Sequence, residues 1–411
     1  MAKVFSDRLV VAIDIGTTKI CVLVAQRLEG SAVEVIGVGH APSHGLRKGV
    51  VVDIGKTVQS IKAAVKEAEL MAGCTIETGY IGISGGHIQS LNSHGVVPIK
   101  NGEVRPFDVA HVLAAARAVK VPEGQQILHV LPQYFVIDGQ ERVLDPIGMH
   151  GIRLEVQAHI ITGATASVQN LVKCSELAGV KVTDIVLEQL ASAAAVLSPD
   201  ERELGICMLD IGGGTSDFAV YQQGSIRHTM VLPVAGNHFT NDVAVGLRTT
   251  LKEAERIKKE YGVAFAEFLK ENRAVEIASV EGNKKQTIEV KRLVEIIQPR
   301  AQEILTLVHE EILKRHLRSY VTAGLVLTGG GSLLKGIDEL ARRIFSIPVR
   351  IGKPRIPLST PESLESPMYA TAYGLLLYAV SKGDVAGMEK LDGPLIKRVF
   401  TRMKSWVNDF F

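Results

Sequence analysis

Two stretches of this sequence combine carboxylates, glycines and hydroxyls at matching positions. Met208 to Tyr221 reads MLDIGGGTSDFAVY, and Leu9 to Ala25 reads LVVAIDIGTTKICVLVA. In each, an apolar run reaches an aspartate, Asp210 or Asp14, which is followed by isoleucine, glycine and then threonine. Glycine inside a strand costs backbone entropy and packs against nothing, so its presence here indicates a close approach of the backbone to another group.

Phosphate with its metal ion is the ligand that this combination fits. Glycines let backbone N–H groups reach phosphate oxygens, and threonine hydroxyls add further donors. A carboxylate in the same turn repels phosphate, so we expect Asp14 and Asp210 to hold Mg²⁺ through its water shell. Neither stretch is a P-loop or a dinucleotide-binding fingerprint. Two glycine turns can coincide by chance, but acid, glycine and threonine recur here in the same order.

A third glycine cluster lies near the C-terminal end. Gly324 to Ala341 reads GLVLTGGGSLLKGIDELA, which predicts a strand, a glycine turn and an amphipathic helix. Glycines at that junction can accept adenine or ribose against the backbone, and a helix N-terminus favours phosphate. Alone, the cluster also fits an ordinary strand-to-helix turn. Together with the other two loops it indicates a nucleotide site.

Composition and patterning indicate how these loops are positioned. The chain has 411 residues, which favours two or more domains, and a formal net charge of +2, which does not suggest nucleic acid as a partner. Its four cysteines are scattered, as in a reduced cytosolic protein, and we expect neither a signal peptide nor a membrane-spanning helix. Strands alternate with helices, and each half opens with a glycine-interrupted strand pair, which predicts an α/β fold of two related halves.

The three motifs, DIGTTK, LDIGGGTSDF and LTGGGSLLKGIDEL, resemble the phosphate and adenosine motifs of the actin, sugar kinase and DnaK-type chaperone superfamily. Two segments rich in alanine and glycine, VTDIVLEQLASAAAVLS and SPMYATAYGLLLYA, resemble the helices that cross between the two halves of those proteins. Within the superfamily, GLRKGVVVDI, GISGGHIQSLNSHGVVPI and the final helix are similar to the FtsA family of bacterial cell division proteins. The resemblance covers essentially the whole chain.

The resemblance implies an actin-like, two-lobed α/β ATPase fold with duplicated halves, a relocated extra subdomain and a C-terminal amphipathic helix. In the inserted subdomain we expect strands around LNSHGVVPIK and HVLPQYFVIDG and a helix near VAHVLAAARAV. The expected boundaries are residues 1–83 with 163–198 and 366–383 for the first lobe core, 84–162 for the inserted subdomain, 199–245 with 303–365 for the second lobe core, 246–302 for its small subdomain, 384–394 for a linker and 395–411 for a membrane-targeting helix.

The resemblance also assigns nucleotide-binding residues. They are Gly16, Thr17, Thr18 and Lys19 in the first phosphate loop, Gly212, Gly213, Gly214 and Thr215 in the second, and Gly329, Gly330, Gly331 and Ser332 in the adenosine loop. Asp14 and Asp210 serve the metal, and Asp210 is also a catalytic candidate. Glu188 matches a polar residue that orients the attacking water in relatives; the alternative is an acid at the N-terminus of a helix on a solvated face.

Glu255 and Lys258, in EAERIKKEYG, match a helix that contacts adenine or ribose in relatives, although this charge spacing is also typical of solvated helix surface. Three histidines of the inserted segment, His87, His94 and His111, have no evident facing carboxylates in the sequence. We therefore expect them to be surface or structural residues and not metal ligands.

The implied function is an ATP-binding, self-associating cell-division adaptor, with at most slow ATP hydrolysis. It anchors FtsZ filaments to the inner face of the cytoplasmic membrane and recruits later division proteins through residues 84–162. The FtsZ C-terminal peptide is typically acidic, and Arg300 in IIQPRAQEIL is the candidate contact, because an exposed guanidinium pairs bidentately with a carboxylate. An ordinary surface arginine after a helix-breaking proline is the alternative. A small-molecule kinase of the sugar kinase type is the alternative function, although no base for a second substrate is evident.

The last segment, LIKRVFTRMKSWVNDFF, predicts a membrane-surface anchor. At about 100° per residue its apolar side chains fall within an arc of roughly 140°. This helix is too short and too charged to span a bilayer, but it suits an interface with anionic lipid, and SKGDVAGMEKLDGP before it fits a flexible tether. A helix docked on the protein's own core is the alternative. The residues expected at the membrane are Ile396, Val399, Phe400, Arg402, Met403, Lys404, Trp406, Val407, Phe410 and Phe411.

Overall fold

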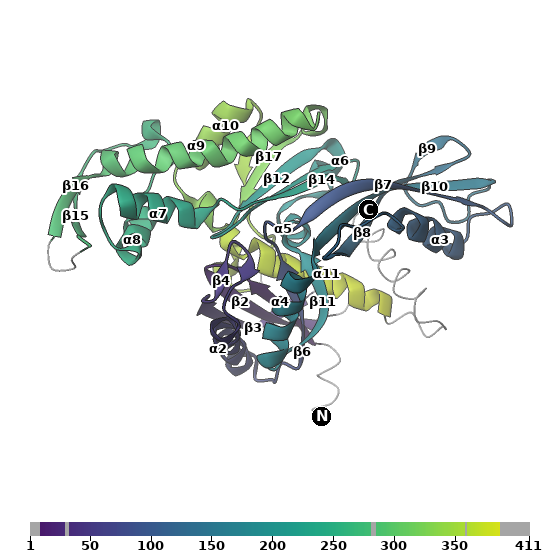
Figure 1. The fold of residues 1–411 in the computed structure, drawn as a ribbon, viewed down its shortest axis with the longest axis horizontal. Coiled ribbons are helices and arrows are strands. Elements are labelled where there is room, and N and C mark those ends of the chain that lie inside the picture. Colours follow the sequence, from purple (N-terminus) through teal and green to yellow (C-terminus); the bar gives the residue numbers. More distant parts are fainter. Residues whose placement is uncertain (1–8, 29–32, 281–284, 358–359, 387–411) are drawn as a thin grey trace.

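The computed structural model describes residues 9–28, 33–280, 285–357 and 360–386, which form two lobes and an inserted subdomain (Figure 1). The first lobe is built on a five-stranded sheet in the order β11-β6-β1-β2-β3. Strands β1 and β2 pair antiparallel around the first glycine turn, whereas β6 and β11 run parallel to β1. The elements of this lobe are β1 Leu9–Ile15, β2 Lys19–Arg27, β3 Val33–Pro42, β4 Leu46–Arg47, β5 Val50–Val51, α2 Ile54–Ala72, β6 Thr78–Ile83, α4 Thr165–Leu177 and β11 Lys181–Leu187.

The second lobe repeats this plan around the second glycine turn. Its sheet has the order β14-β13-β12-β17-β18, in which β12 pairs antiparallel with β13 and parallel with β17. Its elements are α6 Pro199–Leu204, β12 Ile206–Ile211, β13 Ser216–Gln222, β14 Ser225–Leu232, α7 Gly236–Gly246, α9 Val290–Lys314, η3 Arg318–Tyr320, β17 Gly324–Thr328, η4 Gly330–Leu333, α10 Ile337–Phe345 and β18 Val349–Ile351. Because β1 and β12 are buried along nearly their whole lengths, both sheets are covered on both faces.

A small subdomain extends from the second lobe at the left of Figure 1. It contains the helix α8 Leu251–Tyr261, the short helix η2 Ala266–Phe268, and an antiparallel pair formed by β15 Ala274–Ala278 and β16 Lys285–Glu289. The segments AVEIASV and KQTIEVKRL supply these two strands.

The inserted subdomain lies on the opposite side of the molecule, at the right of Figure 1. Its four-stranded antiparallel sheet has the order β7-β10-β8-β9, and one helix packs on it over its own apolar cluster. The two strands and the helix expected in this segment are present, and β10, which the sequence patterns did not reveal, is the strand that β7 and β8 flank. The elements are β7 Gln89–Pro98, α3 Pro106–Arg117, β8 Gln125–Ile137, β9 Gln140–Val143 and β10 Arg153–Ala164.

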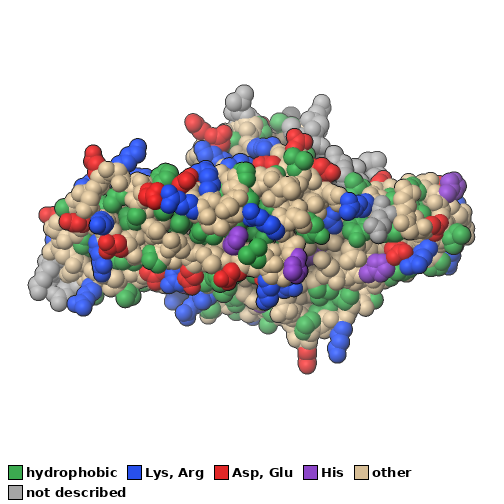
Figure 2. Space-filling view, turned by 90° about the horizontal axis from the view of Figure 1, so that it is seen from above, with side chains coloured by type: hydrophobic (Ala, Val, Ile, Leu, Met, Phe, Trp, Pro, Cys, Tyr) green, Lys and Arg blue, Asp and Glu red, His purple; other side chains and the backbone are tan. Residues whose placement is uncertain are grey.

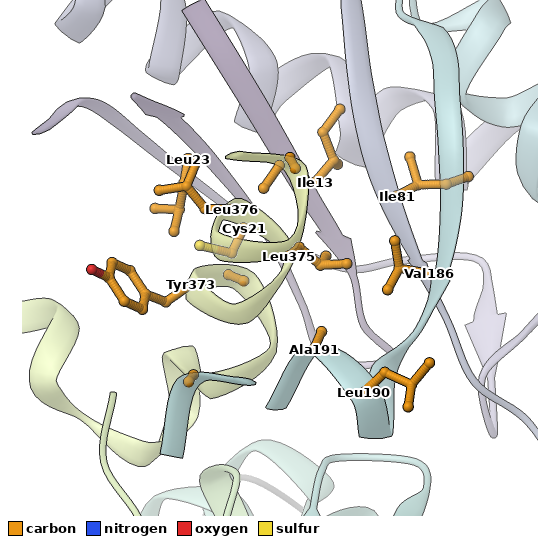
Figure 3. Close-up of a cluster of buried hydrophobic side chains, with 14 of the residues drawn as sticks. Ile13, Cys21, Leu23, Ile81, Val186, Leu190, Ala191, Tyr373, Leu375 and Leu376 are labelled. Carbon is orange, nitrogen blue, oxygen red and sulfur yellow. The ribbon is translucent and has the colours of Figure 1, made fainter. Parts of the chain in front are cut away.

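Two helices, α5 Glu188–Val196 and α11 Ala370–Ala386, cross at the junction of the lobes; the short helices η5 Glu362–Glu365 and η6 Pro367–Tyr369 precede α11. A Cβ atom on Gly374 would collide with the carbonyl oxygen of Ala191, so the crossing requires glycine at this position. Figure 3 shows Leu375 and Leu376 of α11 packed among the apolar side chains of the first lobe. The small residues predicted for the crossing helices therefore allow the two backbones to touch.

Three local predictions were wrong. All of VTDIVL belongs to strand β11, because it pairs with β6 on both sides of an irregularity at Thr183, and α5 begins only at Glu188. Helix α11 continues to Ala386, into the segment expected to be a linker. Pro299 does not end a helix, since α9 continues through it from Val290 to Lys314 and buries an apolar face on the second lobe.

Candidate functional site

The three glycine loops meet around one cavity of about 120 Å³ between the lobes. Four of the lining side chains are carboxylates, and Lys19 is the only lysine or arginine among the described residues that line it. The cavity is lined by Asp14, Ile15, Gly16, Thr17, Thr18, Lys19, Gly49, Glu188, Asp210, Gly212, Gly213, Gly214, Thr215, Asp217, Gly329, Gly330, Pro367, Met368 and Thr371.

The two phosphate loops have the same local geometry. The N–H of Gly16 donates to the carbonyl of Lys19 at 3.1 Å, and the N–H of Gly212 donates to the carbonyl of Thr215 at 2.9 Å. The loops also touch each other across the cleft, because a Cβ on Gly213 would lie 2.6 Å from Thr18 Oγ1. The repeated sequence pattern therefore corresponds to a repeated hairpin turn on facing lobes.

The adenosine loop divides into a part that faces the cavity and a part that supports it. A Cβ on Gly330 would meet no described atom within 4 Å, whereas one on Gly329, whose φ is +79°, would collide with Asp210. Gly331 packs against Ile211, and the hydroxyl of buried Ser332 donates to the carbonyl of Gly329 at 2.7 Å. Gly331 and Ser332 therefore hold the loop and do not line the cavity.

Burial and mutual repulsion disfavour ionisation of the four carboxyl groups in the cavity. Burial raises the pKa of Asp14 to about 6; Lys19 opposes this shift and the charge of Asp210 adds to it. Burial also raises the pKa of Asp217 to about 7 and that of Glu188 well above its usual value, in part through the neighbouring acids. Such a surplus of acidic groups in a cleft favours a cation as ligand.

Polar side chains from both crossing helices hold Asp210. Ser192 of α5 donates to Asp210 Oδ2 at 2.6 Å, and Thr371 of α11 donates to the same oxygen at 3.2 Å. Lys19 Nζ donates to the carbonyl of Met368 at 2.6 Å and so links the first phosphate loop to the start of α11. Glu188 lines the cavity as the first residue of α5, so its side chain is not on the solvated face considered as the alternative.

Asp217 is a cavity residue to which the sequence patterns assigned no role. It is the second acid of LDIGGGTSDF, and its carboxylate accepts hydrogen bonds from Ser84, Gln189 and Thr215 at 2.6, 3.1 and 3.2 Å. Asp217 follows Thr215 of the glycine loop by two residues, and this short spacing was the available signal. Its partner Ser84 was undetectable, because it lies 133 positions away in the sequence, in the turn after β6.

Glu255 and Lys258 do not line the cavity. Lys258 Nζ lies 2.6 Å from Glu255 Oε2 and donates to Thr240 Oγ1 at 2.9 Å and to the carbonyl of Gly236 at 3.2 Å. The N–H of Gly236 in turn donates to the carbonyl of Gly212 at 3.0 Å. The pair therefore supports the second phosphate loop indirectly, through Gly236, on the side away from the cavity.

The guanidinium of Arg300 is not the freely exposed group that the sequence suggested. Its Nε and Nη2 donate to the two carboxylate oxygens of Asp242 at 2.6 and 3.1 Å, and it also pairs with Glu303. The reason is tertiary: α7 packs along α9 and brings Asp242 opposite Arg300.

The histidines of the inserted subdomain also differ from one expectation. His94 Nε2 lies 2.7 Å from Glu155 Oε2 on the neighbouring strand β10, so this histidine does face a carboxylate. His111 lies against the ring of Phe107. Across the described part of the chain, no group of three or more His, Cys, Asp or Glu side chains is arranged to hold a metal ion directly.

The predicted membrane anchor, residues 395–411, lies outside the described residues. No helix within the described ranges is long and apolar enough to cross a membrane. Figure 2 shows acidic and basic side chains interspersed over the face seen from above.

Two family models match this chain. The model described as Cell division protein FtsA matches residues 207–374, and the model described as SHS2 domain inserted in FTSA matches residues 85–162. The chain is 44% identical to Cell division protein FtsA of Pseudomonas aeruginosa over 100% of both chains. It is 39% identical to that of Escherichia coli K12, covering 99% of this chain and 97% of the relative, and 38% identical to that of Bacillus subtilis, covering 93% and 86%.

Solved structures show the same fold at low sequence identity. A chain of the PilM-PilN type IV pilus biogenesis complex matches with a TM-score of 0.65 and 17% identity, covering 90% of this chain and 98% of that one. MreB5 of Spiroplasma citri bound to ADP matches with a TM-score of 0.58 and 16% identity, covering 93% and 99%. The prediction of an actin-like, two-lobed α/β fold with an inserted subdomain is confirmed; its C-terminal helix lies outside the described residues.

Proposed function

Because this chain belongs to the FtsA family of actin-like cell division proteins, we propose that it binds ATP with Mg²⁺ between its lobes and works as a self-associating adaptor. The observation that carries this proposal is the convergence of three glycine loops, from both lobes, on one acidic cavity. Glycine backbones and threonine hydroxyls are suited to phosphate oxygens, and Gly330 leaves open space for the nucleoside.

The acidic groups fit a magnesium ion. Mg²⁺ prefers carboxylate and water oxygens and usually keeps several waters, which agrees with acids that share a cavity without forming a compact direct-ligand cluster. Asp14 and Asp210 would hold the ion, which when bound neutralises phosphate charge. Glu188, at the start of α5, would orient a water molecule beside the phosphates. Ser192 and Thr371 keep the carboxylate of Asp210 directed into the cavity.

Nucleotide binding would change the relation of the two lobes. The cavity of about 120 Å³ is smaller than the roughly 300–1,000 Å³ of typical small-molecule pockets, and the loops touch through Thr18 and Gly213. The loops must therefore separate to admit the phosphates. We expect this motion to be shared by all parts of the molecule attached to either loop, including surfaces used in self-association.

The C-terminal segment would connect this assembly to the membrane. A single amphipathic helix binds lipid modestly, so many copies aligned in a polymer would hold the membrane much more firmly without any new contact. Trp406 is the only tryptophan of the chain, and its fluorescence should shift to the blue when vesicles containing anionic lipid are added. An unshifted spectrum, or co-sedimentation with vesicles that survives deletion of residues 395–411, would refute the anchor.

The small subdomain of the second lobe would receive the acidic C-terminal peptide of FtsZ. Arg300 remains the candidate contact, but a peptide carboxylate must compete with Asp242 for its guanidinium. Arg300→Glu should weaken peptide binding, whereas Arg292→Glu, on the same helix α9 and also paired with a glutamate, should not. Binding of the tail peptide at wild-type strength by Arg300→Glu would remove this residue from the site. Residues 84–162 would bind later division proteins.

Calorimetry of the full chain tests the central proposal. ATP should bind in the presence of Mg²⁺ and much more weakly in EDTA. The production of ADP from ATP should be slow, and added metabolites should not change its rate. Absence of ATP binding would overturn the proposal. Turnover that rises sharply with one sugar or carboxylic acid would favour the small-molecule kinase instead.

A further inference from the structure

The chain enters the inserted subdomain through a short turn that is linked to each phosphate loop through one intervening residue, Asp217 or Gly49. Strand β6 ends at Ile83, and β7 begins at Gln89, so Ser84 and Gly85 are the first residues after the first lobe sheet. The turn is closed by the N–H of Ile88, which donates to the carbonyl of Gly85 at 3.0 Å. Ser84 is buried, with 3% of its surface exposed.

The second phosphate loop reaches this turn through Asp217. Thr215 donates from Oγ1 to Asp217 Oδ2 at 3.2 Å, and Ser84 donates from Oγ to Asp217 Oδ1 at 2.6 Å. A short hydrogen bond to a carboxylate is stronger than one between neutral groups, and breaking it in a buried site leaves a polar group without a partner. The three side chains therefore form a firm link from a nucleotide loop of one lobe to the other lobe.

The first phosphate loop reaches the same turn through Gly49. The N–H of Gly49 donates to Thr17 Oγ1 at 3.1 Å. A Cβ on Gly49 would lie 2.9 Å from both the carbonyl oxygen of Ser84 and the Cα of Gly85, so the backbones are in direct contact. Ser84 and Gly85 thus respond to the positions of both loops.

The body of the inserted subdomain is held elsewhere, on strand β14 of the second lobe. Ser90 donates to the carbonyl of Thr229 at 2.9 Å, and Gln133 donates from Nε2 to the carbonyl of Ile226 at 2.7 Å. His159 Nε2 lies 2.9 Å from Thr229 Oγ1. The subdomain also contacts the first lobe, because His129 of β8 accepts a hydrogen bond from the N–H of Leu187 in β11 at 3.1 Å. It is therefore attached to both lobes, and a movement between the lobes acts on it.

Thr215 has one hydroxyl proton, which it donates either to Asp217 or to a phosphate oxygen but not to both. We propose that Asp217 couples nucleotide binding to the inserted subdomain: a phosphate that takes the Thr215 hydrogen bond changes the bonding of Asp217 to Ser84 and so shifts the entry turn. This inference rests on the proposed binding of ATP in the cleft. Asp217 is a positioning residue in this scheme, because it acts through Ser84.

Linkage makes the coupling reciprocal. A partner that binds the inserted subdomain in one orientation must change ATP affinity by the same factor by which ATP changes the affinity for that partner. ATP in the cleft would then change the affinity of the subdomain for its partner, and a bound partner would change the affinity of the cleft for ATP.

Hydrogen exchange measured by mass spectrometry on the full chain tests the proposal. In the wild type, adding ATP with Mg²⁺ should change amide exchange in β7 and β10, and calorimetry on the same samples records whether ATP binds. Ser84→Ala removes the donor to Asp217 from outside the cavity lining, so it should still bind ATP but lose the exchange response of the subdomain. Ser93→Ala is the matched control, since its hydroxyl donates to the carbonyl of Ala116 within the subdomain at 2.7 Å and makes no described bond to Asp217.

Each outcome decides one question. A wild type that binds ATP with no exchange response in the subdomain would overturn the coupling and leave the ATP site intact, as would a full response in Ser84→Ala. A wild type that does not bind ATP would overturn both. If Ser84→Ala does not fold, Ser84→Cys, which is similar in size but only a weak donor, replaces it: the response should be weakened or lost, and a full response would overturn the coupling.

Discussion

The nucleotide cleft and the junction between the inserted subdomain and β14 are both buried and polar, but they differ in the charge of their polar side chains. The cleft gathers four acidic groups, Asp14, Glu188, Asp210 and Asp217, with a single lysine. The junction pairs neutral donors with neutral acceptors: His159, at 1% exposure, lies within hydrogen-bonding distance of Asn92 on one side and Thr229 on the other.

The pKa values of the buried groups shift in opposite directions in the two regions. Burial raises the pKa of the cleft acids, whereas burial and the nearby charge of His228 lower the pKa of His159 to about 3. Both shifts favour the neutral form of the buried group. The junction satisfies its hydrogen bonds internally and so holds two parts together. The cleft retains a surplus of acids that is balanced either by protons or by a cationic ligand, which distinguishes a binding site from a structural contact.

A side chain in the open part of the cleft should cause the largest effect. Gly330→Leu fills space that no described atom occupies, and Gly213→Leu collides with Thr18, so both should weaken ATP binding about 100-fold or more. Gly55→Leu, at an exposed glycine in the first turn of α2, is the control and should bind normally. Calorimetry measures all three, and unchanged affinity in both cleft variants would place the site elsewhere.

Substitutions at the junction should change the stability of the protein and not its affinity for ATP. His159→Leu leaves Asn92 and Thr229 without their buried partner and should lower the free energy of unfolding by about 2–4 kcal/mol while ATP affinity is retained. His111→Leu, at an exposed position, should change it by less than about 0.5 kcal/mol. Urea unfolding measures both. A loss of ATP affinity of about 100-fold or more in folded His159→Leu would show that the junction is part of the nucleotide site.

The two regions should also oppose each other in pH dependence. An acid whose pKa is higher in the folded state than in the unfolded state binds more protons when folded, so stability rises as the pH falls through that raised pKa and on toward the unfolded pKa. For Asp217, with a folded pKa of about 7, lowering the pH from 8 to 6.5 without Mg²⁺ or nucleotide should add about 1 kcal/mol of stability.

His159 acts in the other direction, because its lowered pKa makes the unfolded state bind the proton first; stability is lost as the pH falls below about 6.5. Thermal unfolding followed from pH 8 to pH 5 should therefore show a rise in stability that levels off below about pH 6.5, where the contributions of Asp217 and His159 cancel. Asp217→Asn should flatten the rise between pH 8 and 6.5. A rise of the same size in that variant would show that Asp217 is not its source.

The smallest effect is expected behind the cleft. Lys258→Met removes the donor to Gly236, which holds the second phosphate loop, and should weaken ATP binding about fivefold, the value of one hydrogen bond. Lys259→Met removes a neighbouring, exposed lysine that pairs with the same Glu255, and should leave affinity unchanged. Equal effects of the two variants in calorimetry would mean that the general charge of α8 matters, and not the contact to Gly236.

The sequence alone determined the glycine loops, the strand pairs around them and the α/β fold. These features depend on residues that are close together in the sequence. Glycine runs between apolar strands are favourable only where a backbone approaches another group, and the repeated order of acid, glycine and threonine is visible without knowledge of distant residues. The segment of α11 was identified as a crossing helix through its resemblance to relatives, and the contact of Gly374 with Ala191 shows why glycine is needed there.

The tertiary structure decided which polar side chains belong to the site. Asp217 and Ser84 are 133 positions apart, and Arg300 and Asp242 are 58 apart, so no spacing in the sequence relates them. It also decided that VTDIVL pairs as a strand beside β6, although the segment reads equally well as the start of a helix. Hydrogen bonds and strand pairing act only over a few ångströms, and the fold determines which distant residues come within that range.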